Sequence, residues 1–189
     1  MRKPMPLFLL VLPLALWGSA QAAPILSIAG PTTVTQGQSN VVYDIDVADD
    51  GGGIDIGGAD LYVTYDPSVF AYVSAAAGSL IGGVDTFSAN DLGTEINLSV
   101  ASLFGISSAG NLGQITFDVL SDAPLPGTSL TFDTGQSSLL DSGFQPVVPD
   151  YAGLDVAVTG AVPAPGAALL LPLGLLAMRA ARMKAVGQS

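Results

Sequence analysis

The chain of 189 residues contains no cysteine and no histidine. It therefore cannot form a disulfide, use a thiol nucleophile, build a Cys/His zinc site or assemble a histidine-based catalytic triad. A secreted domain of ordinary size buries enough apolar surface to fold without disulfides, so the lack of cysteine is compatible with export.

Basic residues are few, and none lies in the middle of the chain. The five are Arg2, Lys3, Arg179, Arg182 and Lys184. All 16 acidic residues lie between Asp44 and Asp155, so residues 24–160 carry 16 negative charges and no positive one. Such a segment cannot neutralise phosphates, which excludes nucleic-acid binding, and it cannot form an internal salt bridge. Its stability has to come from burial and hydrogen bonds, with charge repulsion screened by ions.

The first 23 residues have the three parts of a secretory signal peptide. Two basic residues precede an apolar run of 11 residues, Leu7–Trp17, and a small-residue cleavage site, Ala20-Gln21-Ala22, follows. The alternative is a spanning helix, but 11 residues rise only about 16 Å, half of the hydrocarbon thickness. We predict a signal peptide over residues 1–23, cleaved after Ala22 or Ala23.

Residues 161–189 combine an apolar segment with a basic tail. The sequence Val162-Pro163-Ala164-Pro165-Gly166 leads into an uncharged stretch that ends at Arg179. Because Lys and Arg keep their end of such a segment on the cytoplasmic side, the stretch predicts a hydrophobic transmembrane helix, interrupted by Pro172. The alternative is a buried C-terminal helix, which an all-apolar surface ending in basic residues disfavours.

The motif V-P-x-P-G, the Ala/Leu/Gly span and the basic tail together resemble the PEP-CTERM sorting signal of Gram-negative bacteria. The signal residues here are Pro163, Ala164, Pro165, Arg179, Arg182 and Lys184. The resemblance implies processing by an exosortase-type enzyme, and a place at the cell surface, in the outer envelope or in an exopolysaccharide matrix. Ala164 departs from the pattern, which usually has Glu. Cleavage and retention as an anchor both stay open.

Between the two ends, apolar and polar residues alternate with a period of two. Five segments show it, at residues 40–49, 59–65, 95–100, 115–119 and 154–158. Since successive strand side chains point to opposite faces, each segment predicts a strand with one buried and one solvated side. Gly, Pro and Asp clusters separate the segments, and no amphipathic helix appears. The pattern predicts one all-β domain, residues 24–160, with eight or nine strands in a β-sandwich.

The stretch GADLYVTYDPSVF, residues 58–70, resembles the cohesin domain, in which a strand ends in a Tyr-Asp-Pro corner. Residues 113–119, with the pattern G-x-I-x-F-x-V, and residues 155–160 match two further strands of that family. The resemblance covers nearly all of residues 24–160. It implies a nine-stranded jelly-roll sandwich, related to carbohydrate-binding modules, that binds dockerin modules through one sheet face.

Asp60 is the first outward residue of the strand that ends at Tyr65. In cohesins an aspartate at the matching place faces the dockerin and accepts hydrogen bonds from Ser or Thr, so the resemblance makes Asp60 a candidate contact. Tyr62 and Thr64 share its face, whereas Tyr65 is expected to face the core and Asp66 to cap the corner. The alternative is a solvated carboxylate on an exposed strand. Candidates for a neighbouring strand are Glu95, Asn97 and Ser99.

A loop rich in Asp and Gly is a candidate calcium site, because hard cations bind several carboxylate oxygens. Its acidic residues are Asp46, Asp49, Asp50 and Asp55. They do not follow the D-x-D-x-D-G pattern, and Asp-Gly sequences also make turns, so both interpretations stay open. No other cofactor is expected.

No pattern of catalytic residues is present. A glycosidase needs two carboxylates across a cleft, and 16 acidic residues supply such a pair by chance. We therefore expect a non-enzymatic surface or matrix protein whose cohesin-like module binds a dockerin-type protein or a carbohydrate. The alternative is a structural matrix or adhesin component without a discrete ligand.

Overall fold

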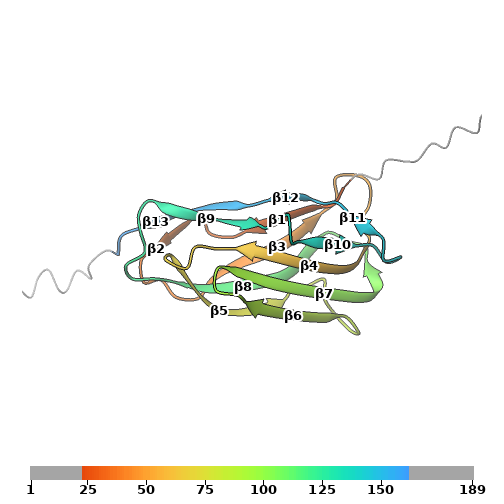
Figure 1. Cartoon of the computed structure of the whole chain (residues 1–189), viewed down its shortest axis with the longest axis horizontal. Helices are drawn as coiled ribbons and strands as arrows, with labels where there is room; N and C mark the ends of the chain where they lie inside the picture. Colours follow the sequence, from red (N-terminus) through yellow and green to blue (C-terminus); the bar gives the residue numbers. More distant parts are fainter. Residues whose placement is uncertain (1–22, 162–189) are drawn as a thin grey trace, which may run out of the picture.

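The computed structural model describes residues 23–161, which form a sandwich of two β-sheets (Figure 1). Nine strands of this part have five or more residues. They are β1 (Ile25–Ala29), β3 (Val41–Ala48), β4 (Ile56–Thr64), β5 (Phe70–Ala77), β6 (Thr86–Asp91), β7 (Glu95–Ile106), β8 (Gly110–Val119), β9 (Gly127–Phe132) and β13 (Leu154–Thr159). Four more have two or three residues, too few to show alternation in the sequence. They are β2 (Thr33–Thr35), β10 (Ser138–Leu140), β11 (Pro146–Val147) and β12 (Asp150–Ala152).

The smaller sheet has the order β12-β1-β3-β8-β5, and the larger sheet runs β11-β10-β4-β9-β13-β2. On its other side β4 pairs with β7, which pairs with β6. The four strands β6, β7, β4 and β10 thus lie side by side and make one end of the larger sheet. The edge strands β5 and β6 approach each other and close one side of the sandwich (Figure 1).

The core lies between the sheets and is built by the alternation that the sequence shows. On β3, Tyr43 and Ile45 are fully buried, and on β4 Leu61 and Val63 face them from the other sheet. Phe117 of β8 lies at the centre of an aromatic group, with its ring 5.1 Å from that of Phe70 and 6.1 Å from that of Tyr43. All core residues fall between Leu26 and Val158, so this part of the chain has a core of its own.

The Tyr65-Asp66-Pro67 corner has the arrangement expected from the sequence. Tyr65 is buried, with its ring 5.2 Å from that of Phe117, and its hydroxyl donates a 2.9 Å hydrogen bond to Asp91 of β6. Burial, together with this bond, raises the pKa of Tyr65 to about 12. Asp66 accepts hydrogen bonds from the backbone N–H and the hydroxyl of Ser68, which fixes the turn.

No helix among residues 23–161 is long and apolar enough to cross a membrane. Residues 1–22 of the predicted signal peptide (1–23) and residues 162–189 of the predicted sorting signal with its transmembrane helix (161–189) lie outside the described residues.

Candidate binding face

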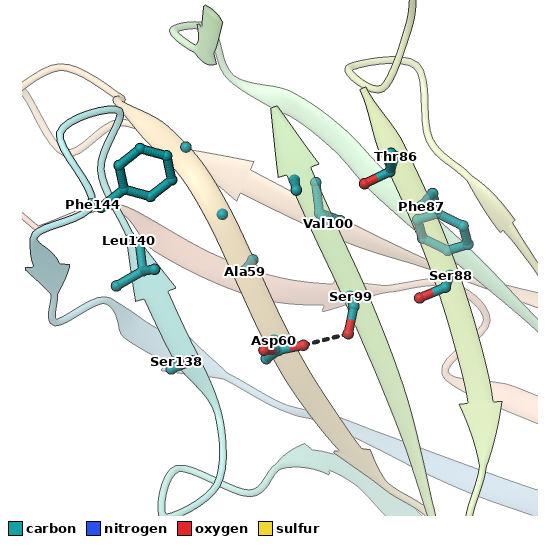
Figure 2. Close-up of a pocket in the computed structure, with 13 residues that line it drawn as sticks. Ala59, Asp60, Thr86, Phe87, Ser88, Ser99, Val100, Ser138, Leu140 and Phe144 are labelled. Atoms are coloured by element: carbon teal, nitrogen blue, oxygen red, sulfur yellow. Dashed lines mark hydrogen bonds between the residues drawn. The ribbon is translucent and has the colours of Figure 1, made fainter. Parts of the chain in front are cut away.

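The outward side chains of β6, β7, β4 and β10 form one continuous surface, which we call the binding face (Figure 2). Asp60 lies near its middle. It is directly opposite Ser99 of β7 on one side and Ser138 of β10 on the other, and Ser88 of β6 follows beyond Ser99. A single row across four strands therefore contains one carboxylate and three hydroxyl groups.

Asp60 is exposed, and the hydroxyl of Ser99 donates a hydrogen bond to its Oδ1 atom (Figure 2). A carboxylate has about four acceptor positions on its two oxygens, so one serine leaves most of them open to solvent or to a ligand. Since residues 24–160 contain no Lys or Arg, no charged group of the domain neutralises Asp60. Ser99 thus holds the Asp60 side chain in place, and the carboxylate can still accept further hydrogen bonds.

Tyr62 and Thr64 lie on the same face as Asp60, and each is half-buried. The register pairs Tyr62 with Asn97 and Thr64 with Glu95, so the neighbouring strand expected from the sequence is β7. The placement of these residues is confirmed. Their part in binding stays a prediction.

Next to the row of Asp60 the surface sinks into a hollow of about 410 Å³. Its floor holds the smallest residues of the face, Gly58 on β4 and Ala101 on β7, which are paired partners. Leu140 of β10 and Phe144 of the turn before β11 stand at one side, and Thr86 of β6 stands at the other (Figure 2). Asp60 also lines the hollow, so one cavity combines apolar walls and a carboxylate.

Sequence reasoning did not find this hollow. Residues 138–149 show no alternation, so the short hairpin that carries Leu140 and Phe144 gave no strand signal. The one available signal was Gly58 itself, because a glycine inside a strand often marks a place where another group comes close to the backbone.

The calcium site predicted at the Asp-Gly loop does not assemble. Asp49 uses its Oδ1 atom to accept the backbone N–H groups of Gly51, at 2.8 Å, and Gly53, at 2.9 Å. These bonds lower the pKa of Asp49 and close a turn. Of the two interpretations of this Asp-Gly loop, a calcium site or a turn, the structure shows the turn.

The remaining aspartates of that prediction point to separate partners. Asp46 lies on β3 and accepts a hydrogen bond from Asn111, Asp55 accepts one from the hydroxyl of Ser142, and Asp50 is exposed in the loop. Within residues 23–161 no group of three or more acidic side chains is placed to hold a metal ion.

The sequence of residues 26–149 matches the family model of the cohesin domain. The chain belongs to the cohesin family. A cohesin domain is a non-catalytic protein-binding module, which confirms the expectation that this protein is not an enzyme. The predicted all-β sandwich is confirmed as a cohesin-like sandwich of two sheets.

Solved cohesins have a similar structure. The sixth cohesin of scaffoldin B from Acetivibrio cellulolyticus, solved in complex with a mutant Cel5 dockerin, is 26% identical with a TM-score of 0.58, over 71% of this chain and 99% of that one. CaCohA2 from Clostridium acetobutylicum is 20% identical with a TM-score of 0.61, over 77% and 95%. The non-cellulosomal cohesin from Archaeoglobus fulgidus is 17% identical with a TM-score of 0.59, over 73% and 92%. The last two show the fold alone. Comparison with curated proteins gives no match.

Proposed function

We propose that this cohesin is an exported recognition module that binds a protein partner of the dockerin type through the binding face. The observation that carries the proposal is Asp60, an exposed carboxylate at the centre of that face, held by Ser99 and surrounded by hydroxyl groups. The A. cellulolyticus cohesin, solved with a dockerin, supports the class of partner.

The composition of the face suits protein recognition. Interfaces combine a polar rim with a few aromatic side chains, and Tyr62 and Phe144 supply aromatic surface on either side of Asp60. A sugar-binding platform would instead need a row of exposed rings that stack on a sugar face, and here Phe144 is exposed at the rim while Tyr62 is half-buried, with no tryptophan in the described part of the chain. Protein binding is thus the stronger of the two functions expected from the sequence.

We also propose that the protein is exported and sorted to the cell surface or an extracellular matrix. The signal-peptide pattern of residues 1–23 supports export, and the PEP-CTERM-like residues after Val162 support sorting to the cell surface or matrix by an exosortase-type enzyme. Intact-mass analysis of the protein outside the cell tests this, because export by a signal peptide removes about 22 residues from the N-terminus. Retention of these residues on the exported protein would contradict the proposal.

The test of binding is capture of extracellular proteins and polysaccharides from the native host with the wild-type domain and with Asp60→Ala. Losing a charged acceptor at the centre of an interface costs about 1.5 to 3 kcal/mol, so the affinity for the captured partner should fall by about 10- to 150-fold. Asp122→Ala is the matched control, because Asp122 is an exposed aspartate of the turn after β8, away from the binding face.

Circular dichroism of both variants should match that of the wild type, since each carboxylate is exposed. A partner that binds Asp60→Ala and the wild type equally would place recognition elsewhere. Capture of a polysaccharide alone would favour the carbohydrate function, and capture of nothing would favour a structural matrix component.

A further inference from the structure

We propose that the hollow beside Asp60 receives a lysine or arginine side chain of the partner protein, with its aliphatic part in the hollow and its charge at Asp60. This inference rests on the proposed function, because it concerns the same face. It adds the chemistry that the partner has to present there.

The two neighbouring glycines of β4 show that the floor of the hollow is not required by the fold. A Cβ atom on Gly57 would lie 2.4 Å from the backbone oxygen of Asp141, so the packing of the hairpin requires glycine at that position. A Cβ atom on Gly58 would meet nothing closer than 3.6 Å, and the backbone there does not need positive φ. The register of β4 shifts between Ile56 and Gly58, and Gly57 is the residue of this irregularity that packs too tightly for a side chain. A glycine at position 58 costs stability and keeps the surface open. What Gly58 provides is the depth of the hollow.

The walls of the hollow suit an aliphatic chain. Leu140 borders the floor, and Phe144 is 71% exposed at the rim. Phe144 also has φ = 61°, a left-handed conformation that bulky residues rarely adopt. The hairpin holds it there through the hydrogen bond from its N–H to the backbone oxygen of Asp141, at 2.9 Å. Residues in unfavourable backbone conformations are enriched at ligand contacts, and here that conformation keeps an exposed aromatic side chain at the rim of the hollow.

The negative charge around the hollow favours a positively charged group at the end of the aliphatic side chain that the hollow receives. Asp60 lies two residues from Gly58 on the same face, about 7 Å away, which is close to the length of an extended lysine side chain. The domain carries 16 acidic residues and no basic one, so a positive group meets no repulsion anywhere on it. Lysine and arginine are the side chains that bury an aliphatic stem and keep the charged end polar, and Phe144 adds a ring face for the cation.

The test is nuclear magnetic resonance titration of residues 23–161, whose strands and core are complete within this part. The probe is Nα-acetyl-lysine N-methylamide. Two reference titrations separate the contributions of the aliphatic chain and the charge of the probe. The norleucine analogue has the aliphatic chain without the ammonium group, and ammonium chloride has the positive charge without the aliphatic chain. We expect the lysine probe to shift the amide signals of Gly58, Ala101 and Phe144 more than either reference does.

Two variants then test each half of the site. Gly58→Leu fills the hollow and should abolish these shifts, whereas Ala76→Leu, which adds the same side chain at an exposed position of β5, should leave them unchanged. Asp60→Asn keeps the shape and removes the charge, and it should weaken lysine binding by about threefold, the size of one exposed ion pair. Asp122→Asn is its control.

The outcomes keep this inference apart from the proposed function. Shifts that spread evenly over all acidic residues, or that survive Gly58→Leu, would overturn the inference, even if the captured partner still requires Asp60. Shifts confined to the hollow together with a partner that ignores Asp60→Ala would show that the hollow can bind a lysine side chain but that the partner does not use it, which would overturn both the inference and the proposed function.

Discussion

The two outer faces of the sandwich both carry aspartates, but they use them differently. On β3, Asp44 accepts hydrogen bonds from Asn111, at 3.0 Å, and from Gln114, at 2.8 Å, and the same Asn111 reaches Asp46 at 3.1 Å. The amides of β8 therefore tie down both carboxylates within the fold. On the binding face, Asp60 has one serine and an adjoining hollow.

The aspartates of β3 are therefore occupied by hydrogen bonds within the domain, whereas Asp60 keeps acceptor positions for another molecule. Asp44 and Asp46 lie on one strand face about 7 Å apart, where repulsion in water amounts to about 0.6 kcal/mol, and the amides offset it. Asp60 has no acidic neighbour in its own row and needs no such support. The aspartates of the smaller sheet are thus held by the fold, whereas Asp60 of the larger sheet keeps acceptor positions free, as the proposed function requires.

The largest effect on stability is expected from the two glycines that border the hollow. Gly57→Ala forces a Cβ against the backbone of Asp141, which cannot easily move, and should cost about 3 kcal/mol or more of unfolding free energy. Gly58→Ala should leave stability unchanged or raise it by about 0.5 to 1 kcal/mol, because alanine loses less entropy in a strand. Urea unfolding of both variants measures the contrast. Equal losses would mean that Gly58 is structural and that the hollow is a by-product of packing.

The second prediction compares the polar partners of the aspartates. Asn111→Ala removes the hydrogen bonds to Asp44 and Asp46 and exposes their repulsion, which should cost about 1.5 to 3 kcal/mol. Ser99→Ala removes one exposed hydrogen bond to Asp60 and should cost about 0.5 kcal/mol. Thermal unfolding of both variants checks the order. If Ser99→Ala were the more damaging change, Asp60 would have a structural role.

The third prediction concerns the inner faces, where each sheet contributes a buried tyrosine. Burial raises the pKa of Tyr43, and burial with the Asp91 bond raises that of Tyr65, each from 10.0 to about 12. The folded protein holds both phenolic protons more tightly than the unfolded chain does. Stability from this source is therefore complete below pH 10.0 and is lost as the pH rises through about 12.

Unfolding free energies measured in steps from pH 9 to 12 test it, with the double variant Tyr43→Phe, Tyr65→Phe as the control. The alkaline fall in stability should shrink in the control. A fall of the same size in both proteins would assign it to other groups.

The smallest effect is that of added ions. Salt should raise the melting temperature of residues 23–161 slightly, because it screens 16 negative charges that no basic residue offsets. Calcium chloride and sodium chloride at equal ionic strength should differ little, since no three acidic side chains of the described part are placed around one ion. A large stabilisation by micromolar calcium would show a cation site that the structure does not contain.

The buried residues of the sandwich were well predicted from the sequence, because apolar residues that face the core alternate with polar residues along each strand. The alternation on β3 and β4 identified the inward residues, and with them the outward position of Asp60, Tyr62 and Thr64. The Tyr65 corner was predictable for a related reason, since a short motif fixes its turn and its buried ring.

The hollow and the calcium loop were not predictable by the same means. The strand that pairs with β4 opposite β7 is β10, which has three residues and shows no alternation in the sequence. Leu140 and Phe144 could therefore not be placed beside Gly58. Carboxylates that are close in sequence, such as Asp46 and Asp49, diverge because one lies on a strand and the other turns its oxygen onto the loop backbone.

The most direct test of the comparison is to measure the binding of the captured protein partner to Asp60→Ala and to Asp44→Ala by calorimetry, beside urea unfolding of both. Each variant removes one aspartate from an outward strand position, one from each sheet. Asp60→Ala should lose about 10- to 150-fold in affinity with stability nearly unchanged, whereas Asp44→Ala should bind normally and be the less stable protein. Normal binding by Asp60→Ala, or an equal loss of affinity in both variants, would contradict this prediction.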